Sequence, residues 1–140
     1  MSQSHPDTFP SYVVIGHVAK DLVPGGFRIG GTVTYAAVTA RNLGRRVGVV
    51  TSAAPDFPLR QALHGMELCV IPAETTTTFE NIYHNGARTQ FIHARATLIT
   101  PAHVPLSWRN APIVHLGPIA QEVEEDLCTC LLYTSPSPRD

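Results

Sequence analysis

The sequence has few of the features that mark a secreted, membrane or nucleic-acid-binding protein. It has no apolar run of about 18 residues, the length that crosses a bilayer. Its first residues, MSQSHPDTFPS, have neither the basic nor the apolar segment of a secretion signal. The arginines are scattered, and a formal net charge of −1 offers no basic surface to phosphate backbones. We therefore expect a cytoplasmic protein that binds neither nucleic acid nor membranes.

The sequence also lacks the common short motifs for nucleotides and metals. Residues 16–19 (GHVA) depart from the Gly-x-Gly-x-x-Gly dinucleotide motif, and no Walker A sequence occurs. The seven histidines include no His-Glu-x-x-His motif and no close Cys/His cluster, and the 3 cysteines are too few for a disulfide framework. We expect no metal site, a core role for His115, and Cys69 as a small buried apolar residue.

Composition and periodicity indicate one soluble α/β domain. The chain has 140 residues, of which 44% are hydrophobic and 15% charged, as in ordinary globular proteins. Apolar runs typical of buried strands occur at 12–18, 47–51, 68–71 and 112–117. Three helices are predicted between or after these strands: one from Thr32 to Leu43, a short one capped by Asp56, and one within 119–127. This order predicts a parallel sheet flanked by helices.

Two segments predict β-hairpins. In 22–31 (LVPGGFRIGG) a Pro-Gly-Gly turn separates two short extended pieces. In 75–96 the Asn85-Gly86 pair is the strongest short hairpin signal. A turn there pairs the strands as follows: Tyr83 with Arg88, Asn81 with Gln90, and Phe79 with Ile92. The polar face that results suits a polar ligand, and it suits a solvated surface equally well.

The last residues differ from everything before them. Cys130 to Asp140 (CLLYTSPSPRD) has no periodic apolar pattern and contains two Ser-Pro pairs. The segment also resembles the translation of a sequencing-library adapter. We therefore expect residues 129–140 to be an artefactual tail that takes no part in the fold.

Four segments together resemble the ribokinase-like (PfkB) carbohydrate kinase family. They are the opening motif GHVAKD at 16–21, the di-glycine and helix GGTVTYAAVTARNLG at 30–44, the lid hairpin TTTTFENIYHNGARTQ at 75–90, and the strand and loop APIVHLGPIAQEV at 111–123. Their order and spacing agree with the family along residues 12 to 127. Thr32 and Tyr35 stand where many members have Lys and Asn, and the pattern is more similar to the branch that includes inositol kinases.

The resemblance implies a ribokinase-like α/β fold with a small β-hairpin lid. It also implies transfer of a phosphoryl group from ATP, as its magnesium complex, to a hydroxyl of a sugar or polyol. The family's catalytic Gly-Ala-Gly-Asp motif and nucleotide pocket are absent from residues 1–128, so we expect an inactive amino-terminal part of a longer kinase domain. A homodimer through the lid is a candidate assembly. A non-catalytic sugar- or nucleoside-binding protein on the same fold is the alternative.

The resemblance and the residue chemistry select candidate site residues. Asp21, expected at the carboxyl end of the first strand, would accept hydrogen bonds from two hydroxyls of a polyol. Gly30 and Gly31 would let the backbone approach the ligand and the lid pivot. Thr32 and Thr34 would contact the ligand or only cap the helix. Candidate lid contacts are Asn81, Tyr83, Arg88 and Gln90, and no catalytic or metal-binding residue is expected.

Overall fold

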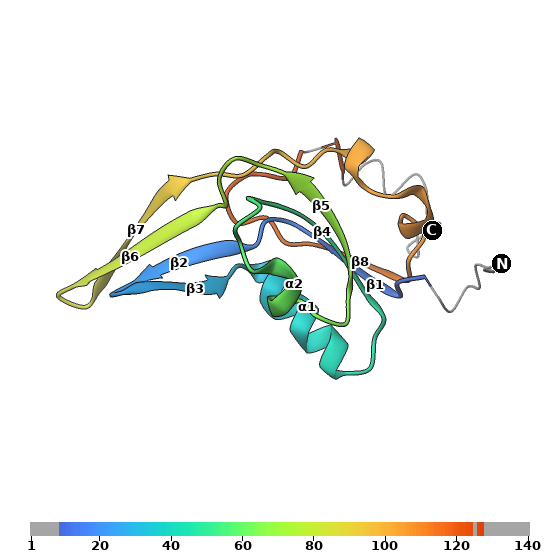
Figure 1. Cartoon of the computed structure of the whole chain (residues 1–140), viewed down its shortest axis with the longest axis horizontal. Helices are drawn as coiled ribbons and strands as arrows, with labels where there is room; N and C mark the ends of the chain where they lie inside the picture. Colours follow the sequence, from blue (N-terminus) through green and yellow to red (C-terminus); the bar gives the residue numbers. More distant parts are fainter. Residues whose placement is uncertain (1–8, 125, 128–140) are drawn as a thin grey trace.

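Two four-stranded sheets make up the protein (Figure 1), as seen in a computed structural model that describes residues 9–124, 126 and 127. The core sheet has the strand order β5-β4-β1-β8, and the lid sheet has the order β3-β2-β6-β7. The lid extends away from the core sheet as a long, thin layer (Figure 1). The two sheets therefore have different surroundings: the core sheet lies among helices and loops, whereas the lid projects beyond them.

The core sheet is parallel throughout, as the sequence predicts. It consists of β1 (Tyr12–Ile15), β4 (Val47–Ala53), β5 (Glu67–Pro72) and β8 (Ile113–Leu116). All residues of β4 are buried, as expected for a β-branched strand covered on both faces. β1 ends before its predicted limit at Val18. The chain leaves the sheet at Gly16, which lies so close to the carbonyl oxygen of Gly117 that a Cβ atom there would overlap it.

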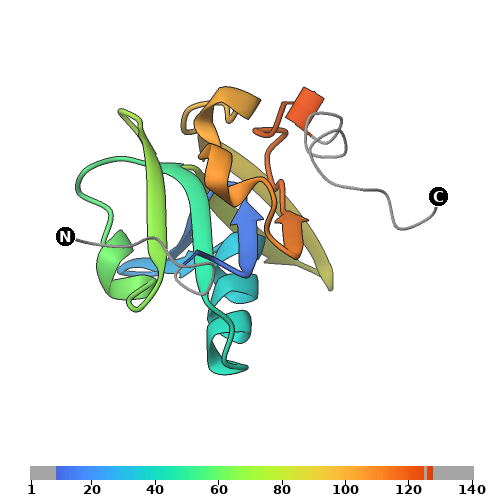
Figure 2. The same cartoon turned by 90° about the vertical axis from the view of Figure 1, so that its right-hand side faces the viewer.

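Different elements cover the two faces of the core sheet (Figures 1 and 2). α1 (Thr32–Asn42) and α2 (Leu59–Ala62) pack on one face, and the 3₁₀ helices η2 (Pro101–His103) and η3 (Leu106–Trp108) pack on the other. α1 ends at a left-handed Gly44 (φ 89), as its sequence predicts. The predicted cap at Asp56 is wrong, because Pro58 occupies the N-cap position of α2 and no side chain caps that helix.

The lid sheet joins two hairpins through a parallel pair of strands. β2 (Ala19–Val23) and β3 (Gly26–Gly30) form one hairpin, and β6 (Thr78–His84) and β7 (Ala87–Ala94) form the other. β2 pairs with β6 to connect them. The three cross-strand pairs predicted from the Asn85-Gly86 turn are all present. Asn85 (φ 51) and Gly86 (φ 80) both take the positive φ angles that a tight hairpin turn requires.

The segment after β8 departs from the prediction. Residues 119–127 were expected to begin a helix, but within this segment only 126 and 127 of the described residues have helical geometry. Gln121 takes a φ of 58, which an α-helix does not accommodate, and Val123 instead forms an isolated β-bridge with Ile99. The predicted adapter tail, residues 129–140, lies outside the described residues. No helix in the part of the chain described here is long and apolar enough to cross a membrane.

Two residues predicted to have structural roles lie in or beside the core. Cys69 is a partly buried free cysteine whose sulfur lies 3.4 Å from the carbonyl oxygen of His103. His115 is partly buried, and its Nδ1 atom lies 2.6 Å from the hydroxyl of Tyr12. A satisfied histidine in a core strand needs no ligand to explain it.

Candidate functional site

A cavity of about 400 Å³ lies between the lid and the start of α1. Strands β2, β6 and β7, the amino end of α1 and the loop after β8 contribute its walls. The lining residues are Ala19, Asp21, Gly31, Thr32, Tyr35, Phe79, Asn81, Arg88, Gln90 and Ile119. We call this space the acceptor cavity. It brings together six residues that the sequence singled out from three distant segments: Asp21, Gly31, Thr32, Asn81, Arg88 and Gln90.

Asp21 lies in the middle of β2, which is not where the sequence placed it. The expected position at the carboxyl end of the first core strand is wrong, because the chain has already left the core sheet at Gly16 and entered the lid. Asp21 pairs with Arg28 on one side and with Phe79 on the other. Its carboxyl group is partly buried, and this desolvation raises its pKa above the usual value of an aspartate. A half-buried carboxylate in a cavity wall is well suited to accept hydrogen bonds from a ligand.

The two glycines before α1 make room for this arrangement. A Cβ atom on Gly30 would collide with the carboxylate of Asp21. A Cβ atom on Gly31 would lie 2.9 Å from the carbonyl oxygen of His17, and the φ of 95 at Gly31 is itself unfavourable for other residues. Glycine at both positions therefore lets the start of α1 pack closely against the segment that leads into β2.

The two threonines of α1 differ in their surroundings. Thr32 is exposed and lines the acceptor cavity. Thr34 is buried, and its hydroxyl donates a hydrogen bond to the carbonyl oxygen of Gly30 at 2.8 Å, so it is not part of the cavity wall. No side chain caps the amino end of α1. The positive end of the helix dipole therefore lies next to the cavity.

The polar side chains of the lid differ in their burial and in whether they line the cavity. The Oδ1 atom of Asn81 is buried and has no hydrogen-bond partner among the described residues, which is costly unless a ligand supplies one. Arg88 and Gln90 reach the cavity from β7. Tyr83 is 72% exposed near the turn and does not line the cavity, although it shares their strand face.

Sequence reasoning did not select the rest of the wall. Phe79, Ala19 and Ile119 are apolar, and such residues carry no sign of a site before the chain is folded. Tyr35 was noted only for differing from the family pattern. Its spacing of three residues from Thr32 on a helix could have placed both on the cavity side.

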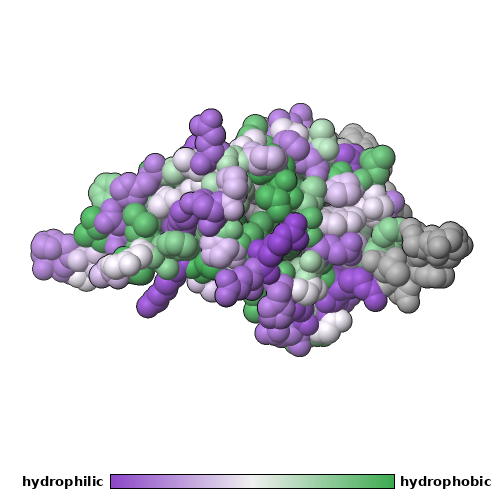
Figure 3. All heavy atoms as spheres, viewed as in Figure 1, coloured by the Kyte–Doolittle hydropathy of each residue, from purple (hydrophilic) through white to green (hydrophobic). Residues whose placement is uncertain are grey.

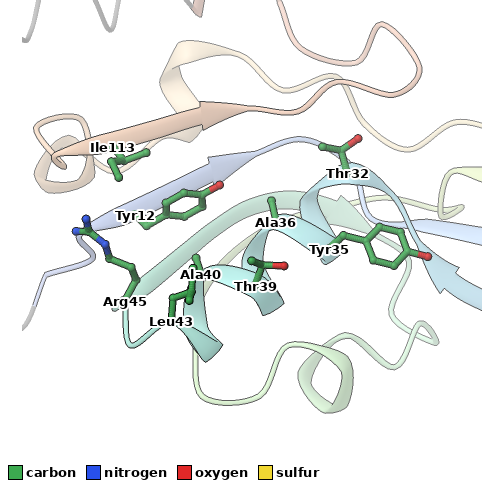
Figure 4. Close-up of a pocket in the computed structure, with 9 residues that line it drawn as sticks. All are labelled: Tyr12, Thr32, Tyr35, Ala36, Thr39, Ala40, Leu43, Arg45 and Ile113. Carbon is green, nitrogen blue, oxygen red and sulfur yellow. The ribbon is translucent and has the colours of Figure 1, made fainter.

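A second, mostly apolar cavity of about 630 Å³ lies between α1 and β8 (Figure 4). Tyr12, Arg45 and Ile113 lie at one end, and Thr32 and Tyr35 lie at the other, where they also border the acceptor cavity. No carboxylate lines it. It therefore offers a polyhydroxyl ligand only the neutral hydroxyl groups of Thr and Tyr side chains as acceptors. Within the described residues, no three His, Cys, Asp or Glu side chains are grouped to hold a metal ion.

Solved structures share this fold. A fructokinase from Xylella fastidiosa is 18% identical, with a TM-score of 0.53 over 77% of this chain and 41% of that one. No protein-family model and no curated protein sequence matches the chain. The protein therefore has the ribokinase-like α/β fold, which is the fold of carbohydrate kinases.

More similar structures come from one branch of that fold. A pyrophosphate-dependent kinase in the ribokinase family, complexed with a pyrophosphate analog and myo-inositol, is 30% identical with a TM-score of 0.70. The match covers 89% of this chain and 46% of that one. A pyrophosphate-dependent myo-inositol-1 kinase converted by mutation into a myo-inositol-3 kinase is 28% identical, with a TM-score of 0.66 over 86% and 43% of the two chains. These matches confirm the resemblance to the ribokinase-like (PfkB) carbohydrate kinases. This chain spans less than half the length of either structure.

Proposed function

We propose that this chain forms the acceptor side of a kinase that phosphorylates a hydroxyl of a sugar or polyol, with myo-inositol as the foremost candidate acceptor. The observation that carries the proposal is the acceptor cavity, which is lined by the half-buried Asp21 and by Asn81, whose buried Oδ1 atom has no partner among the described residues. The 30% identity to a kinase complexed with myo-inositol supports the choice of acceptor.

In this proposal the chain binds and orients the acceptor. Asp21 accepts hydrogen bonds from two neighbouring hydroxyls, and Asn81 accepts one more through its Oδ1 atom. Arg88 and Gln90 donate to acceptor oxygens from the lid. Thr32 lies at the cavity wall nearest the amino end of α1. The lid excludes water when it closes over the acceptor, which favours phosphoryl transfer over hydrolysis.

The remaining predicted contacts have supporting roles in this proposal. Gly30 and Gly31 give Asp21 and the backbone the space to approach the acceptor. Thr34 fixes the carbonyl group of Gly30 through its hydroxyl. Tyr83 would reach the acceptor only after the lid has moved, because it lies outside the cavity.

The phosphoryl donor is a separate part of the proposal. The sequence resemblance favours ATP with magnesium, whereas the most similar structures named above belong to pyrophosphate-dependent kinases. No metal-binding cluster is present within the described residues and the sequence has no Walker A loop, so this part of the chain favours neither donor. ATP and pyrophosphate are therefore the two donors to compare.

We also propose that residues 1–128 are the amino-terminal part of a longer kinase domain and that residues 129–140 are derived from a sequencing adapter. The apolar cavity between α1 and β8 supports this division, because the rest of such a domain would cover it. Deleting residues 130–140 should leave the free energy of unfolding unchanged within error. A clear loss of stability on deletion would argue that the tail belongs to the protein.

A homodimer through the lid completes the proposal. Leu22, Ile82 and Phe91 are 38%, 45% and 47% exposed on the lid face opposite the acceptor cavity. Hydrophobic side chains also interrupt the polar surface toward the lid end of the molecule (Figure 3). Sedimentation of the complete protein should show a dimer that Ile82→Lys converts to a monomer.

The test of the function is a phosphorylation screen of the complete protein encoded by the parent gene. Myo-inositol, hexoses and nucleosides are offered with either ATP or pyrophosphate, and phosphate transfer is followed by mass. Transfer to a polyol or sugar supports the proposal. Tight acceptor binding without transfer from either donor would favour the non-catalytic sugar- or nucleoside-binding protein, as would a parent gene without a Gly-Ala-Gly-Asp segment.

A further inference from the structure

A fully buried carboxylate lies at the junction of the core and the lid. The side chain of Glu122 is 0% exposed and accepts three backbone N–H groups: that of His17 at 2.9 Å, that of Ile119 at 3.0 Å and that of Ala120 at 2.7 Å. Burying a charged group is unfavourable unless hydrogen bonds compensate for the lost water. An apolar side chain here would in turn leave three backbone donors without this partner. The carboxylate thus ties the segment before β2 to the loop after β8.

The imidazole of His17 extends this connection into both arms of the lid hairpin. Its Nε2 atom lies 2.7 Å from the carbonyl oxygen of Thr97, just after β7, and its Nδ1 atom lies 2.6 Å from the hydroxyl of Thr77, just before β6. A carbonyl oxygen only accepts, so Nε2 carries the hydrogen and Nδ1 accepts from the Thr77 hydroxyl. The Thr77 oxygen in turn accepts the N–H of Ala96 at 3.0 Å. Every group is satisfied when the ring is neutral.

We infer that Glu122 and His17 form a clamp, which we name the hinge clamp, that fixes the base of the lid to the wall of the acceptor cavity. Both are positioning residues for acceptor binding, a role that rests on the proposed function. Neither lines the acceptor cavity, so each acts through the residues that it holds.

The residues held by the hinge clamp are those that shape the cavity. Ile119, whose N–H binds Glu122, lines the acceptor cavity and also a third cavity, of about 820 Å³. Ile119 and Ala120 also pack in a small apolar cluster with Ala19 and Phe79, so the hydrogen bonds to Glu122 and this cluster together determine the position of the loop. On the other side of the clamp, His17 lies two residues before Ala19. Ala19 is the first residue of β2, the strand that contains Asp21. A displacement of the clamp therefore moves the carboxylate and the opposite wall of the cavity together.

The decisive variant is Glu122→Gln in the complete kinase, because an amide retains the size but replaces one acceptor oxygen with a donor. Amide hydrogen exchange at His17, Ile119 and Ala120 should become about 10- to 100-fold faster, the range expected for losing one charge-assisted hydrogen bond. The KM for myo-inositol should rise by about tenfold or more while the KM of the phosphoryl donor stays unchanged. Glu67→Gln, an exposed carboxylate on β5, is the matched control and should change neither.

A second pair of variants tests the lid arm and does not depend on Glu122→Gln folding. Thr77→Val removes the hydroxyl and should speed exchange at Ala96 and raise the myo-inositol KM, whereas Thr77→Ser keeps the hydroxyl and should behave as wild type. Uniformly faster exchange across the core sheet in both Glu122→Gln and Thr77→Val would show a merely structural role and overturn the inference. Faster exchange at the hinge with an unchanged myo-inositol KM would also overturn it. If wild type transfers no phosphate to any acceptor, the proposed function fails, and the exchange data alone uphold or overturn the hinge clamp.

Discussion

The core sheet and the lid sheet have the same number of strands but differ in how far those strands are buried. The core strands are parallel, and the central strand β4 is buried along its whole length. In β7 of the lid, every residue but Ala94 is exposed. The buried apolar residues that join the lid to the rest of the molecule are few: Ala19, Phe79 and Ala120. Buried apolar contacts are therefore concentrated in the core, and the lid, where we propose that the acceptor binds, is joined to it by few of them.

The largest expected effect separates the two sheets by stability. Ile15 in β1 is 0% exposed, and Ile15→Ala should lower the free energy of unfolding by about 2–5 kcal/mol, since it removes buried methyl groups and leaves a cavity. The same substitution in the lid, at the 46% exposed Ile92 on the other lid face, should change it by no more than about 0.5 kcal/mol. Urea unfolding of both variants measures the difference. Equal losses would show that the lid is as strongly integrated as the core.

The second prediction concerns a lid residue that should affect acceptor binding but not stability. In the complete kinase, Asp21→Asn should weaken acceptor binding by about 10- to 1000-fold, because up to two charge-assisted hydrogen bonds are lost. The free energy of unfolding should not fall at neutral pH, since burial already disfavours the charged form of Asp21, as its raised pKa indicates.

Calorimetric titration with myo-inositol and with the donor measures the effect of Asp21→Asn, and donor affinity should stay the same. Asp56→Asn, at an exposed position, is the control and should leave both affinities unchanged. An unaltered acceptor affinity in Asp21→Asn would remove Asp21 from the site.

The third prediction concerns pH at the boundary between the sheets. Burial lowers the pKa of His17 below its usual value, so the unfolded chain binds a proton below about pH 6.5 while the folded chain does not. Stability should therefore fall as the pH drops from about 6.5 to the lowered pKa, by up to about 1.4 kcal/mol per pH unit from this group. His17→Gln should reduce this slope, whereas the exposed His64→Gln should retain it. An identical slope in both variants would contradict the assignment of a neutral buried ring.

The smallest expected effect lies at a single atom of the lid. Asn81→Ala removes the buried Oδ1 atom that lacks a partner, so it should weaken acceptor binding by about 2- to 13-fold, the value of one neutral hydrogen bond. The folded state should lose no stability, because the unpaired polar group disappears. Asn110→Ala, at an exposed turn, serves as the control. A stability loss in Asn81→Ala with intact binding would indicate a structural partner for Asn81.

The sequence predicted the parts of the fold that local patterns determine. Apolar runs located the core strands, and Asn85-Gly86 determined the register of the lid hairpin, because the turn type leaves one pairing possible. The same register brought Asn81, Arg88 and Gln90 to one face, and the cavity contains all three.

The predictions were wrong where contacts between distant segments of the chain determine the structure. The position of Asp21 in the lid depends on the pairing of β2 with β3 and with the distant β6, and no local pattern predicts the pairing with β6. The predicted helix within 119–127 does not begin at Ile119, because Val123 pairs with Ile99 and the N–H groups of Ile119 and Ala120 bind Glu122. A buried glutamate that accepts backbone N–H groups has no signature in the sequence, so the hinge clamp could not have been predicted.

The parallel pairing of β2 with β6 has a consequence for the order in which the molecule forms. Each lid hairpin is local in sequence and can close quickly, but Asp21 meets Phe79 only after a long stretch of chain, including α1, β4 and β5, has been ordered between them. The seam between the hairpins should therefore form only after both hairpins have closed. Since Asp21 lies in that seam, the wall of the acceptor cavity is completed late, whichever hairpin forms first.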